Sequence, residues 1–477
     1  PLYRGKCMTQ SSTTLLALSL TFFTLTAQAE SLRDIYELAL ENDAQLKAEE
    51  AQYLANLESE NIGRSALLPQ IAANYDYTDS DQDREAESFE VSGGGITAID
   101  TFTNTDVSTD GYQVSLRQAL FDLPAWFSFQ SGKEFTKQAE ATFAANQQNL
   151  IVRTVEAYLL VLRAQDNLDA SKAQERAFER QLEQTQQRFE VGLIAITDVY
   201  EAQAAYDLSR VNRIVDENNV SVALERLSVL TGQRHSTLSV LKEDFEINPP
   251  EPNDRAAWVE FALENNFNLA ASRYAEEVAR QSAKANQLEH APKVSGSYAY
   301  SDFSTDGDLN RKPATDFDTS PDNDTELNTW TIRLDVPLYT GGAISANRRR
   351  AAQEFNAARE QRINLTRNTV TNARSLHMTV VSDVARVAAR KQSIVSSSSA
   401  LDATQAGYEV GTRNVVDVLN AQNTLFAAQR DYANSRYDYI INVMRLKEQA
   451  GLLNPQDVYN LDSYLVTPPP PTSSTSK

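Results

Sequence analysis

The sequence repeats itself, and this internal duplication limits what the chain can fold into more than any other feature. Residues 39–46 read ALENDAQL, and residues 262–269 read ALENNFNL. Near the end of each half, Glu-Val-Gly-Leu at 190–193 returns as Glu-Val-Gly-Thr at 409–412. Chance can produce one such match, but not an ordered series across both halves. The sequence therefore predicts two tandem structural repeats of one kind of unit.

The repeats set the expected domain boundaries. We place the first repeat at residues 30–252 and the second at residues 253–455, followed by a C-terminal segment at 456–477. Residues 468–477 are rich in proline and then in serine and threonine, a composition typical of a disordered tail.

Each repeat is expected to begin with helices and to continue with a pair of strands. Pro69 and Pro292 mark the change, because proline disfavours helix in the residue before it. After each proline, apolar and polar residues alternate, as a half-buried strand requires. The strand pairs are predicted at about 70–122 and about 293–340, with an acidic loop inside each pair.

The alternation predicts a sheet with one apolar face. Trp330, Ile332 and Leu334 point one way, while Arg333 and Asp335 point the other way. Aromatic residues lie near the predicted strand ends, as the interfacial girdles of a membrane barrel would require; they are Tyr75, Tyr77, Phe121, Tyr298, Tyr300 and Tyr339. The alternative is an ordinary sheet with one face on a soluble core. Charged residues opposite the apolar face, where a watery lumen would lie, favour the barrel.

Each strand pair is followed by a very long helical stretch. Residues 124–190 contain one glycine and one proline, and residues 343–406 contain neither. A single helix of that length would reach about 100 Å and could not bury itself within one small domain. Second helices are expected to run back, so the helical regions are predicted at 124–232 and 343–451. Their alanine-rich, polar seams favour helices packed around water.

The number of strands then predicts an oligomer. Two hairpins supply four strands per chain, whereas about eight is the practical minimum for a closed barrel. An open edge in lipid would leave unpaired backbone amides that cost several kcal/mol each. The barrel must therefore be shared between subunits.

The first 29 residues have the features of a secretory signal peptide. Arg4 and Lys6 precede an apolar run, and Ala27-Gln28-Ala29 forms a cleavage site. The mature chain is then expected to begin near Glu30. The only cysteine, Cys7, would be removed, which excludes disulfides and thiolate chemistry from the mature protein.

Charge excludes one class of partner. The net charge is −21, so no basic face is available for the phosphates of a nucleic acid. The acids are concentrated in the two predicted loops. Residues 79–110 carry nine acidic residues and one basic residue, and residues 302–326 carry eight and two.

Two further stretches carry a specific resemblance. Residues 187–199 (QRFEVGLIAITDV) and 407–419 (GYEVGTRNVVDVL) resemble the periplasmic-end motifs of the TolC family of outer-membrane efflux channels. Residues 68–70, 336–342 and 434–439 support the resemblance. It covers nearly all of the expected mature chain.

The resemblance implies an α+β membrane protein of the Gram-negative outer membrane. A long α-helical coiled-coil barrel, the periplasmic tunnel, would join a transmembrane antiparallel β-barrel that three protomers share. The expected partners are two further copies in a homotrimer, a periplasmic adaptor (membrane fusion) protein, an inner-membrane pump of RND, ABC or MFS type, and outer-membrane lipid with lipopolysaccharide. The channel would be a passive gated duct for drugs, toxic small molecules or secreted proteins, with the pump choosing the cargo.

The resemblance also implies a gate. In the family, polar links at the periplasmic end hold the second helix pair to the first, within and between subunits. The matching positions are Tyr408 and Arg413 on one side and Thr197, Asp198 and Gln181 on the other. A guanidinium and a phenol hydroxyl can both reach one carboxylate. Surface salt bridging of a coiled coil would use the same residue types.

Pore constriction and adaptor contact complete the implied site. The family lines its constriction with two rings of aspartates; here Asp417 matches the first ring and Asn420 replaces the second. How strongly the pore prefers cations is therefore left open. The adaptor is expected to touch the helix-turn tips, which are Val191, Gly192, Leu193, Val410, Gly411 and Thr412. Both tip glycines also suit plain helix C-caps.

No constellation for catalysis, a cofactor or a metal is predicted. The three histidines are scattered, and the sequence has no zinc-protease, nucleophile-elbow or P-loop motif. Asp79, Asp81 and Asp83 imitate the ligand spacing of a calcium loop, but Arg84 occupies the position of the turn glycine. An enzyme is thus disfavoured. The competing reading is a structural coiled-coil stalk or adhesin, which would need no gate residues.

Overall fold

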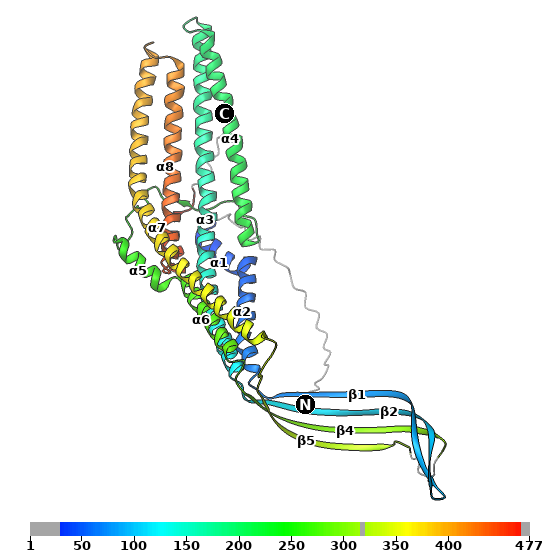
Figure 1. Ribbon diagram of the computed structural model, residues 1–477. Coiled ribbons are helices and arrows are strands. Elements are labelled where there is room, and N and C mark those ends of the chain that lie inside the picture. The colour runs from blue at the N-terminus through cyan, green and yellow to red at the C-terminus, as the bar shows by residue number, and fades with distance from the viewer. Residues whose placement is uncertain (1–28, 315–319, 469–477) are drawn as a thin grey trace, which may run out of the picture.

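The computed structural model describes residues 29–314 and 320–468. A bundle of long helices, here called the helical arm, is joined at one end to a four-stranded sheet (Figure 1). The expected signal peptide, apart from Ala29, lies outside the described residues, as does nearly all of the expected disordered tail. The arm and the sheet are the parts from which a functional site can be built.

The elements follow the same order twice: two helices, two strands, a very long helix and a shorter one. The first series is α1 Leu32–Asn42, α2 Ala44–Ser65, β1 Gln70–Ser92, β2 Gly95–Phe121, α3 Leu123–Glu190 and α4 Ile196–Thr231. The second is α5 Arg255–Asn265, α6 Phe267–Gln287, β4 Lys293–Lys312, β5 Asn323–Asp335, α7 Ala343–Glu409 and α8 Val415–Gln449. The short elements β3 Val240–Leu241, α9 Pro455–Asp462 and β6 Leu465–Val466 lie between and after them.

The long helices occupy the stretches that are nearly free of glycine and proline. α3 has 68 residues and α7 has 67, so each spans about 100 Å. Pro124 lies in the first turn of α3, where a missing amide hydrogen costs nothing, and the Asp122 carboxylate accepts from the Ala125 amide. Across the arm the four long helices run in the order α7, α8, α3, α4 (Figure 1).

The main sheet is antiparallel throughout, in the order β1-β2-β4-β5. Tyr75 lies opposite Tyr112, and Tyr298 lies opposite Trp330. β1 and β5 are the two edges, and among the described residues each pairs on one side only.

The predicted acidic loops are wrong in extent, because much of each is strand. β1 continues to Ser92 and β2 starts at Gly95, so only Gly93 and Gly94 turn the chain, with φ of 61° and 91°. Two glycines can adopt the positive φ values that a tight hairpin needs. The ladder hydrogen bonds satisfy the backbone whatever the side chains carry. The carboxylates of Asp81 and Asp83 are exposed and accept from the Asn104 side chain on the neighbouring strand.

The strand register also corrects the predicted distribution of charge. Arg117, Arg333 and Asp335 do lie opposite the apolar face. Beyond Tyr77, however, the acids continue on the same face as the apolar residues, because they keep the same parity along the strand. These acids include Asp79, Asp81, Asp83, Glu85, Glu87, Asp106 and Asp110. One face of the sheet is therefore apolar near the arm and acidic at the far end.

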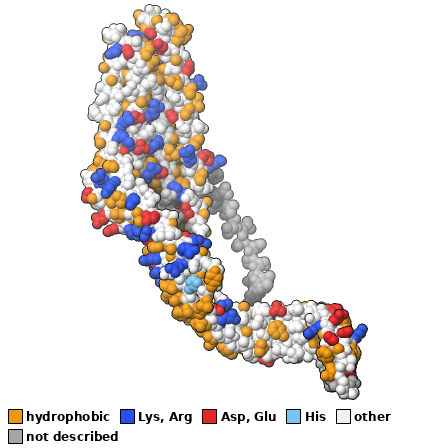
Figure 2. Space-filling view, in the orientation of Figure 1, with side chains coloured by type: hydrophobic (Ala, Val, Ile, Leu, Met, Phe, Trp, Pro, Cys, Tyr) orange, Lys and Arg blue, Asp and Glu red, His pale blue; other side chains and the backbone are white. Residues whose placement is uncertain are grey.

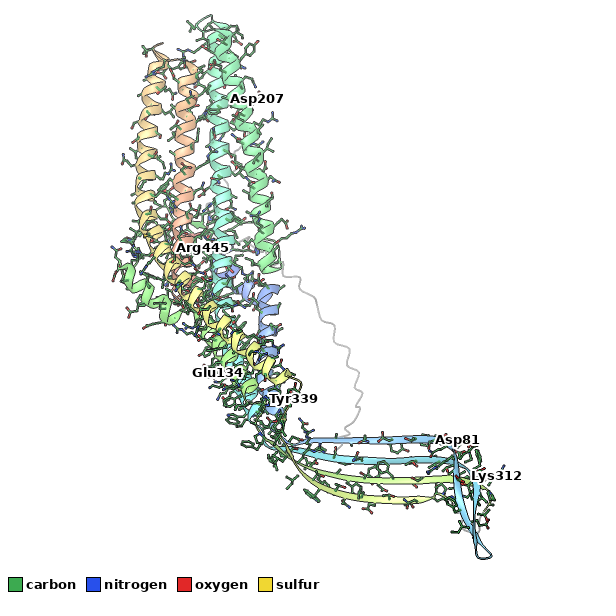
Figure 3. The ribbon with its side chains drawn as sticks, viewed as in Figure 1. Asp81, Glu134, Asp207, Lys312, Tyr339 and Arg445 are labelled. Atoms are coloured by element: carbon green, nitrogen blue, oxygen red, sulfur yellow. The ribbon has the colours of Figure 1, made fainter. Side chains whose placement is uncertain are left out.

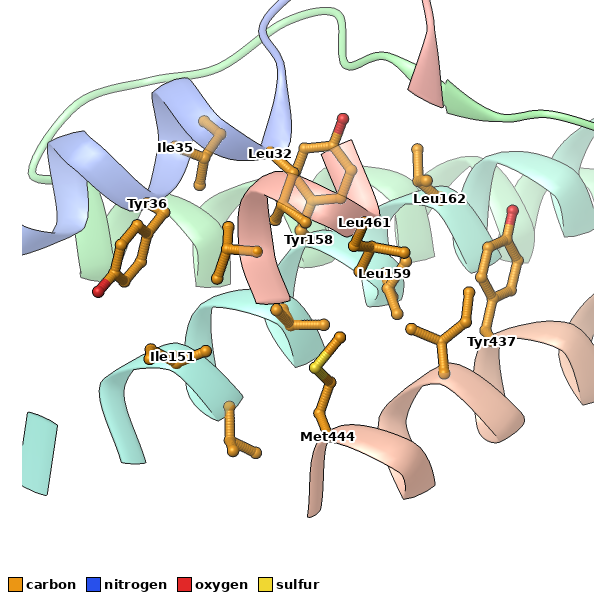
Figure 4. Packing of buried hydrophobic residues seen from close by; sticks show 14 of the residues in the cluster. Leu32, Ile35, Tyr36, Ile151, Tyr158, Leu159, Leu162, Tyr437, Met444 and Leu461 are labelled. Carbon is orange, nitrogen blue, oxygen red and sulfur yellow. The ribbon is translucent and has the colours of Figure 1, made fainter. Parts of the chain in front are cut away.

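The hydrophobic core lies midway along the arm and not in the sheet. Tyr158, Leu159 and Leu162 of α3 meet residues of α1, α8 and α9 there (Figure 4). The segment between the two halves and the C-terminal segment also reach this level, where β3 pairs with β6. Tyr158 ties these segments to α3, because its buried hydroxyl donates to the Ser239 carbonyl at 2.7 Å.

Within the described ranges, no helix combines the length and the apolar character that a membrane span needs.

Tyr158→Phe tests the role of the core hydrogen bond. The substitution leaves the buried Ser239 carbonyl without its donor, so we expect a loss of about 1–2 kcal/mol of unfolding free energy. Urea denaturation at fixed protein concentration measures it, since association affects apparent stability. Tyr200→Phe, at an exposed position on α4, is the matched control. Equal midpoints for both variants would contradict the assignment.

Candidate functional site

Two helix-turn tips lie side by side at the end of the arm that is farthest from the sheet (Figure 1). The α3–α4 tip turns at Gly192 with φ of 76°, and the α7–α8 tip turns at Gly411 with φ of 78°. The amide of Leu193 donates to the Arg188 carbonyl at 2.9 Å, which closes the end of α3. All six predicted adaptor-contact residues lie in these turns and are exposed.

A small apolar group, here called the tip cluster, lies beneath the two turns. Its buried members are Phe178, Tyr408, Val415, Val418 and Leu419. They come from α3, α7 and α8. The cluster therefore joins the two helix pairs close to their tips.

Tyr408 is the predicted gate residue that this cluster holds most closely. Its side chain is buried, at 8% exposure, and the Arg188 guanidinium lies over its ring at 4.6 Å. Its hydroxyl has no hydrogen-bond partner in the described part of the chain. Tyr408 shares a cleft of about 420 Å³ with Gln181, another predicted gate residue.

Arg413 and Asp417 pair on their own helix end. The Arg413 Nη1 atom lies 3.9 Å from the Asp417 Oδ2 atom. Asp417 also forms a capping box with Asn414, whose side chain accepts from the Asp417 amide at 2.9 Å. The Asn-x-x-Asp spacing could have revealed this cap from the sequence. Asn420 follows one turn later and is exposed.

Of the predicted gate residues, Gln181 and Tyr408 line one cleft, whereas Thr197 and Asp198 lie outside its lining. No hydrogen bond or ion pair among the described residues joins Thr197 or Asp198 to Tyr408 or Arg413. Thr197 and Asp198 lie in the first turn of α4, whereas Tyr408 ends α7. In the arm, α3 and α8 lie between α4 and α7 (Figure 1), although α4 also contacts α8 directly.

A ladder of polar contacts between α3 and α8 was not predicted from the sequence. The hydroxyl of Tyr437 donates to Asp166 at 2.6 Å, and Arg445 pairs with Glu156 at 2.7 Å. Arg445 lies midway along the arm (Figure 3). The contact nearest to the tips joins Gln174 to Asn423 at 2.6 Å. From there to the tips, the described residues show no hydrogen bond or ion pair between the two helix pairs.

Metal chemistry finds no support in the geometry. Residues 29–314 and 320–468 contain no group of three histidine, cysteine or acidic side chains that could hold a metal ion. Asp79, Asp81 and Asp83 lie in the extended strand β1, which cannot wrap around a calcium ion as a loop would.

Comparison with known proteins decides the family. Residues 35–233 and again 258–452 match the family described as outer membrane efflux protein. The chain is 36% identical over 443 residues to the outer membrane protein TolC of Vibrio cholerae, covering 92% of this chain and 94% of that protein. The chain belongs to the outer membrane efflux protein family.

Other relatives and solved structures agree. The Pseudomonas aeruginosa alkaline protease secretion protein AprF is 30% identical, over 91% of this chain and 86% of its own length. The fold matches the Campylobacter jejuni CmeC outer membrane channel with a TM-score of 0.71 at 15% identity, over 97% of this chain and 98% of that one. VceC of Vibrio cholerae gives 0.69 at 16% identity, over 88% and 96%.

This outer membrane efflux protein is thus an outer-membrane channel of a Gram-negative bacterium. The family and the relatives are channel proteins and not known enzymes. The tip cluster and the polar ladder are therefore features of a channel's helical arm.

In the polar ladder, the environment of the Asp166 carboxyl group disfavours its ionised form. Burial raises the pKa of Asp166, although the Tyr437 hydroxyl and the charge of Arg436 lower it. A raised folded-state pKa means that the ionised carboxylate costs stability at neutral pH. That cost is absent below the pKa of the unfolded chain.

Asp166→Asn tests this cost. The amide oxygen still accepts from the Tyr437 hydroxyl, but the buried charge is gone. We expect a higher unfolding midpoint in urea than for the parent at about pH 7, with the difference shrinking toward about pH 4. Asp402→Asn, at an exposed position on α7, is the control. A variant that is less stable than the parent at neutral pH would show that the ladder needs the charge.

Proposed function

We propose that three copies of this chain form one passive, gated duct that works with a periplasmic adaptor and an inner-membrane pump. The observation that carries the proposal is the four-stranded sheet with two open edges, β1 and β5. An open edge cannot lie in lipid, because its amides would have no partners. Joining β5 of one copy to β1 of the next yields twelve strands, which is enough to close a barrel.

The dimensions of the apolar face support membrane insertion. On β2 the apolar face extends over the nine residues from Tyr112 to Leu120. A tilted strand that crosses the hydrocarbon of a bilayer has about 9–11 residues. Tyr75 lies opposite Tyr112, and the Tyr300 ring lies 6.0 Å from the Tyr112 ring, so these tyrosines supply the aromatic girdle at that border.

The helical arm suits a tunnel built from two structural repeats per chain. The family matches the chain twice, over ranges that lie within the proposed repeats 30–252 and 253–455. Each repeat supplies one long helix and one shorter partner. Most of the long helices lie outside the core, and their exposed faces are free to meet those of neighbouring protomers in a coiled-coil barrel.

The gate is best placed between protomers. Tyr408 keeps an unused hydroxyl near the tips, and Arg413 is exposed and only weakly paired. Gln181, Thr197 and Asp198 of a neighbouring protomer are the proposed partners. The exposed links of Arg413, worth about 1 kcal/mol or less, are easily broken when the duct opens, whereas the Tyr408 hydroxyl is buried and reaches a neighbour only when the tip cluster opens.

Asp417, with Asn420 one turn behind it, is the proposed pore constriction. Three Asp417 carboxylates near one axis would attract cations, and Arg413 reduces their charge. The exposed tip residues are the proposed adaptor contact. The relatives include one protein named for protease secretion and one named for efflux, so both classes of cargo are possible for such a duct and the pump would choose between them.

The gate predicts a conductance change in planar lipid bilayers. Tyr408→Phe combined with Arg413→Ser removes both proposed links, so we expect the small conductance of the parent to rise severalfold. Tyr53→Phe with Arg367→Ser makes the same chemical changes on the arm away from the tips and should leave conductance unchanged. No conductance from any folded oligomer would favour the structural stalk instead.

The constriction predicts opposite shifts of ion selectivity. Asp417→Asn should lower the preference for cations over anions, and Arg413→Ser alone should raise it, because the carboxylate loses its partner. Reversal potentials in a KCl gradient measure the ratio. Asp207→Asn, on the exposed side of α4, is the control (Figure 3). If both tip variants keep the parent's selectivity, Asp417 does not line the pore.

A further inference from the structure

The apolar face of the sheet ends at the arm in a group of exposed apolar side chains, here called the collar. Its members are Leu120, Phe121, Trp126, Leu338 and Tyr339. Leu338 and Tyr339 are the most exposed of these, at 88% and 85%. Tyr339 lies where the arm joins the sheet (Figure 3), and hydrophobic side chains gather over that end of the arm (Figure 2). The collar has the character of a membrane border.

A run of three arginines follows the collar at the start of α7. Arg348, Arg349 and Arg350 are all exposed, and the first acidic residue of α7 is Glu354. Arg350 approaches Glu354 at 3.6 Å, with both side chains more than 60% exposed. Arg348 and Arg349 make no hydrogen bond or ion pair within the described part of the chain. Two guanidinium groups without a partner among the described residues, and a third that is only weakly paired, therefore stand together next to the collar.

Their height above the collar fits a headgroup layer. α7 begins at Ala343, so the three arginines lie roughly 8–11 Å along its axis. A headgroup layer extends roughly 5–8 Å beyond the hydrocarbon on each side of a bilayer. Arginine side chains are long enough to reach back toward that layer while their stems stay near the apolar border. Successive residues of a helix are about 100° apart, so three of them cover a wide sector.

We propose that Arg348, Arg349 and Arg350 bind the phosphate groups of anionic phospholipids in the membrane leaflet nearest to the arm. This inference rests on the proposed insertion of the sheet. A guanidinium group presents paired N–H donors that match a phosphate, and its charge favours a lipid with net negative charge over a zwitterionic one. Lipid is the favoured source of phosphate because the collar places these side chains at a bilayer.

The arrangement distinguishes the two ends of the sheet. Near the arm, the arginines attract lipid phosphates. At the far end, the acids on the outward face, among them Asp79, Asp81 and Asp83, repel the same groups. The bound phospholipids would therefore hold the arm at one height and orientation below the membrane, which keeps the tips at a constant distance from it.

Tryptophan quenching tests the proposal in the full-length protein. The chain has three tryptophans, and Trp258 is buried. Trp126→Phe and Trp330→Phe with Tyr339→Trp place the only exposed tryptophan beside the arginines. The oligomer is reconstituted in phosphatidylethanolamine vesicles that contain chain-brominated phosphatidylglycerol or, separately, chain-brominated phosphatidylethanolamine. We expect the brominated phosphatidylglycerol to compete about fivefold better for the site.

Arginine variants complete the experiment. Arg348→Gln, Arg349→Gln and Arg350→Gln together should reduce the preference to about equal competition. Lys172→Gln, Arg176→Gln and Arg180→Gln remove three exposed charges from α3 far from the sheet and should preserve it. Equal quenching by both brominated lipids in the arginine-containing protein would overturn the proposal while leaving membrane insertion intact. Absence of quenching by either lipid would overturn the insertion as well.

Two further readouts separate other roles of the arginines. If the triple arginine variant changes ion selectivity but not lipid preference, the arginines face the channel interior and the proposal is wrong. Excess inorganic phosphate should leave the lipid preference in place. Loss of the preference in that buffer would identify a site for soluble phosphate instead.

Discussion

The pairing of backbone amides at the two edges of the sheet is the constraint on which the rest of the structure depends. The sheet has four strands, and β1 and β5 each pair on one side only. Its apolar face is exposed, as is that of a sheet which meets lipid, yet unpaired amides in lipid cost several kcal/mol each. Neither problem has a solution within one chain. The proposed three-copy barrel solves both at once, because it pairs the edges and surrounds the apolar face with lipid.

The helical arm needs contacts beyond one core, because its helices are too long for one core to stabilise them. The core around Tyr158 and Leu162 holds the arm together at mid-length, and the polar ladder continues from it to Gln174 and Asn423. Between that point and the tips, the two helix pairs touch through the tip cluster and the contact of Arg188 with Tyr408. The arm is therefore most strongly cross-linked in its middle and least so at its tips, which is where a duct that opens needs movable parts.

For several whole helices and strands, the sequence-based predictions agree with the structure. Unbroken helix was expected at 124–190 and 343–406, and α3 and α7 occupy those stretches. Strands were expected after Pro69 and Pro292, and β1 and β4 begin there. The prediction of long acidic loops is wrong, because a high density of charge does not by itself prevent strand formation. Carboxylates that alternate on an exposed strand do not oppose the ladder, so β1 and β2 continue to the two-glycine turn.

The sequence by itself determined the features that depend on near neighbours in the chain. These are the helical and strand periodicities, the turns at Gly192 and Gly411, the presence of two strand pairs, and the motifs that reveal the family. Only the tertiary structure decided which distant side chains meet. It placed Tyr408 beside Arg188 and Gln181, paired Tyr437 with Asp166, and left the Tyr408 hydroxyl without a partner among the described residues. The physical reason is that periodicity specifies the face on which a residue lies, whereas its partner depends on the order and register in which separate helices pack.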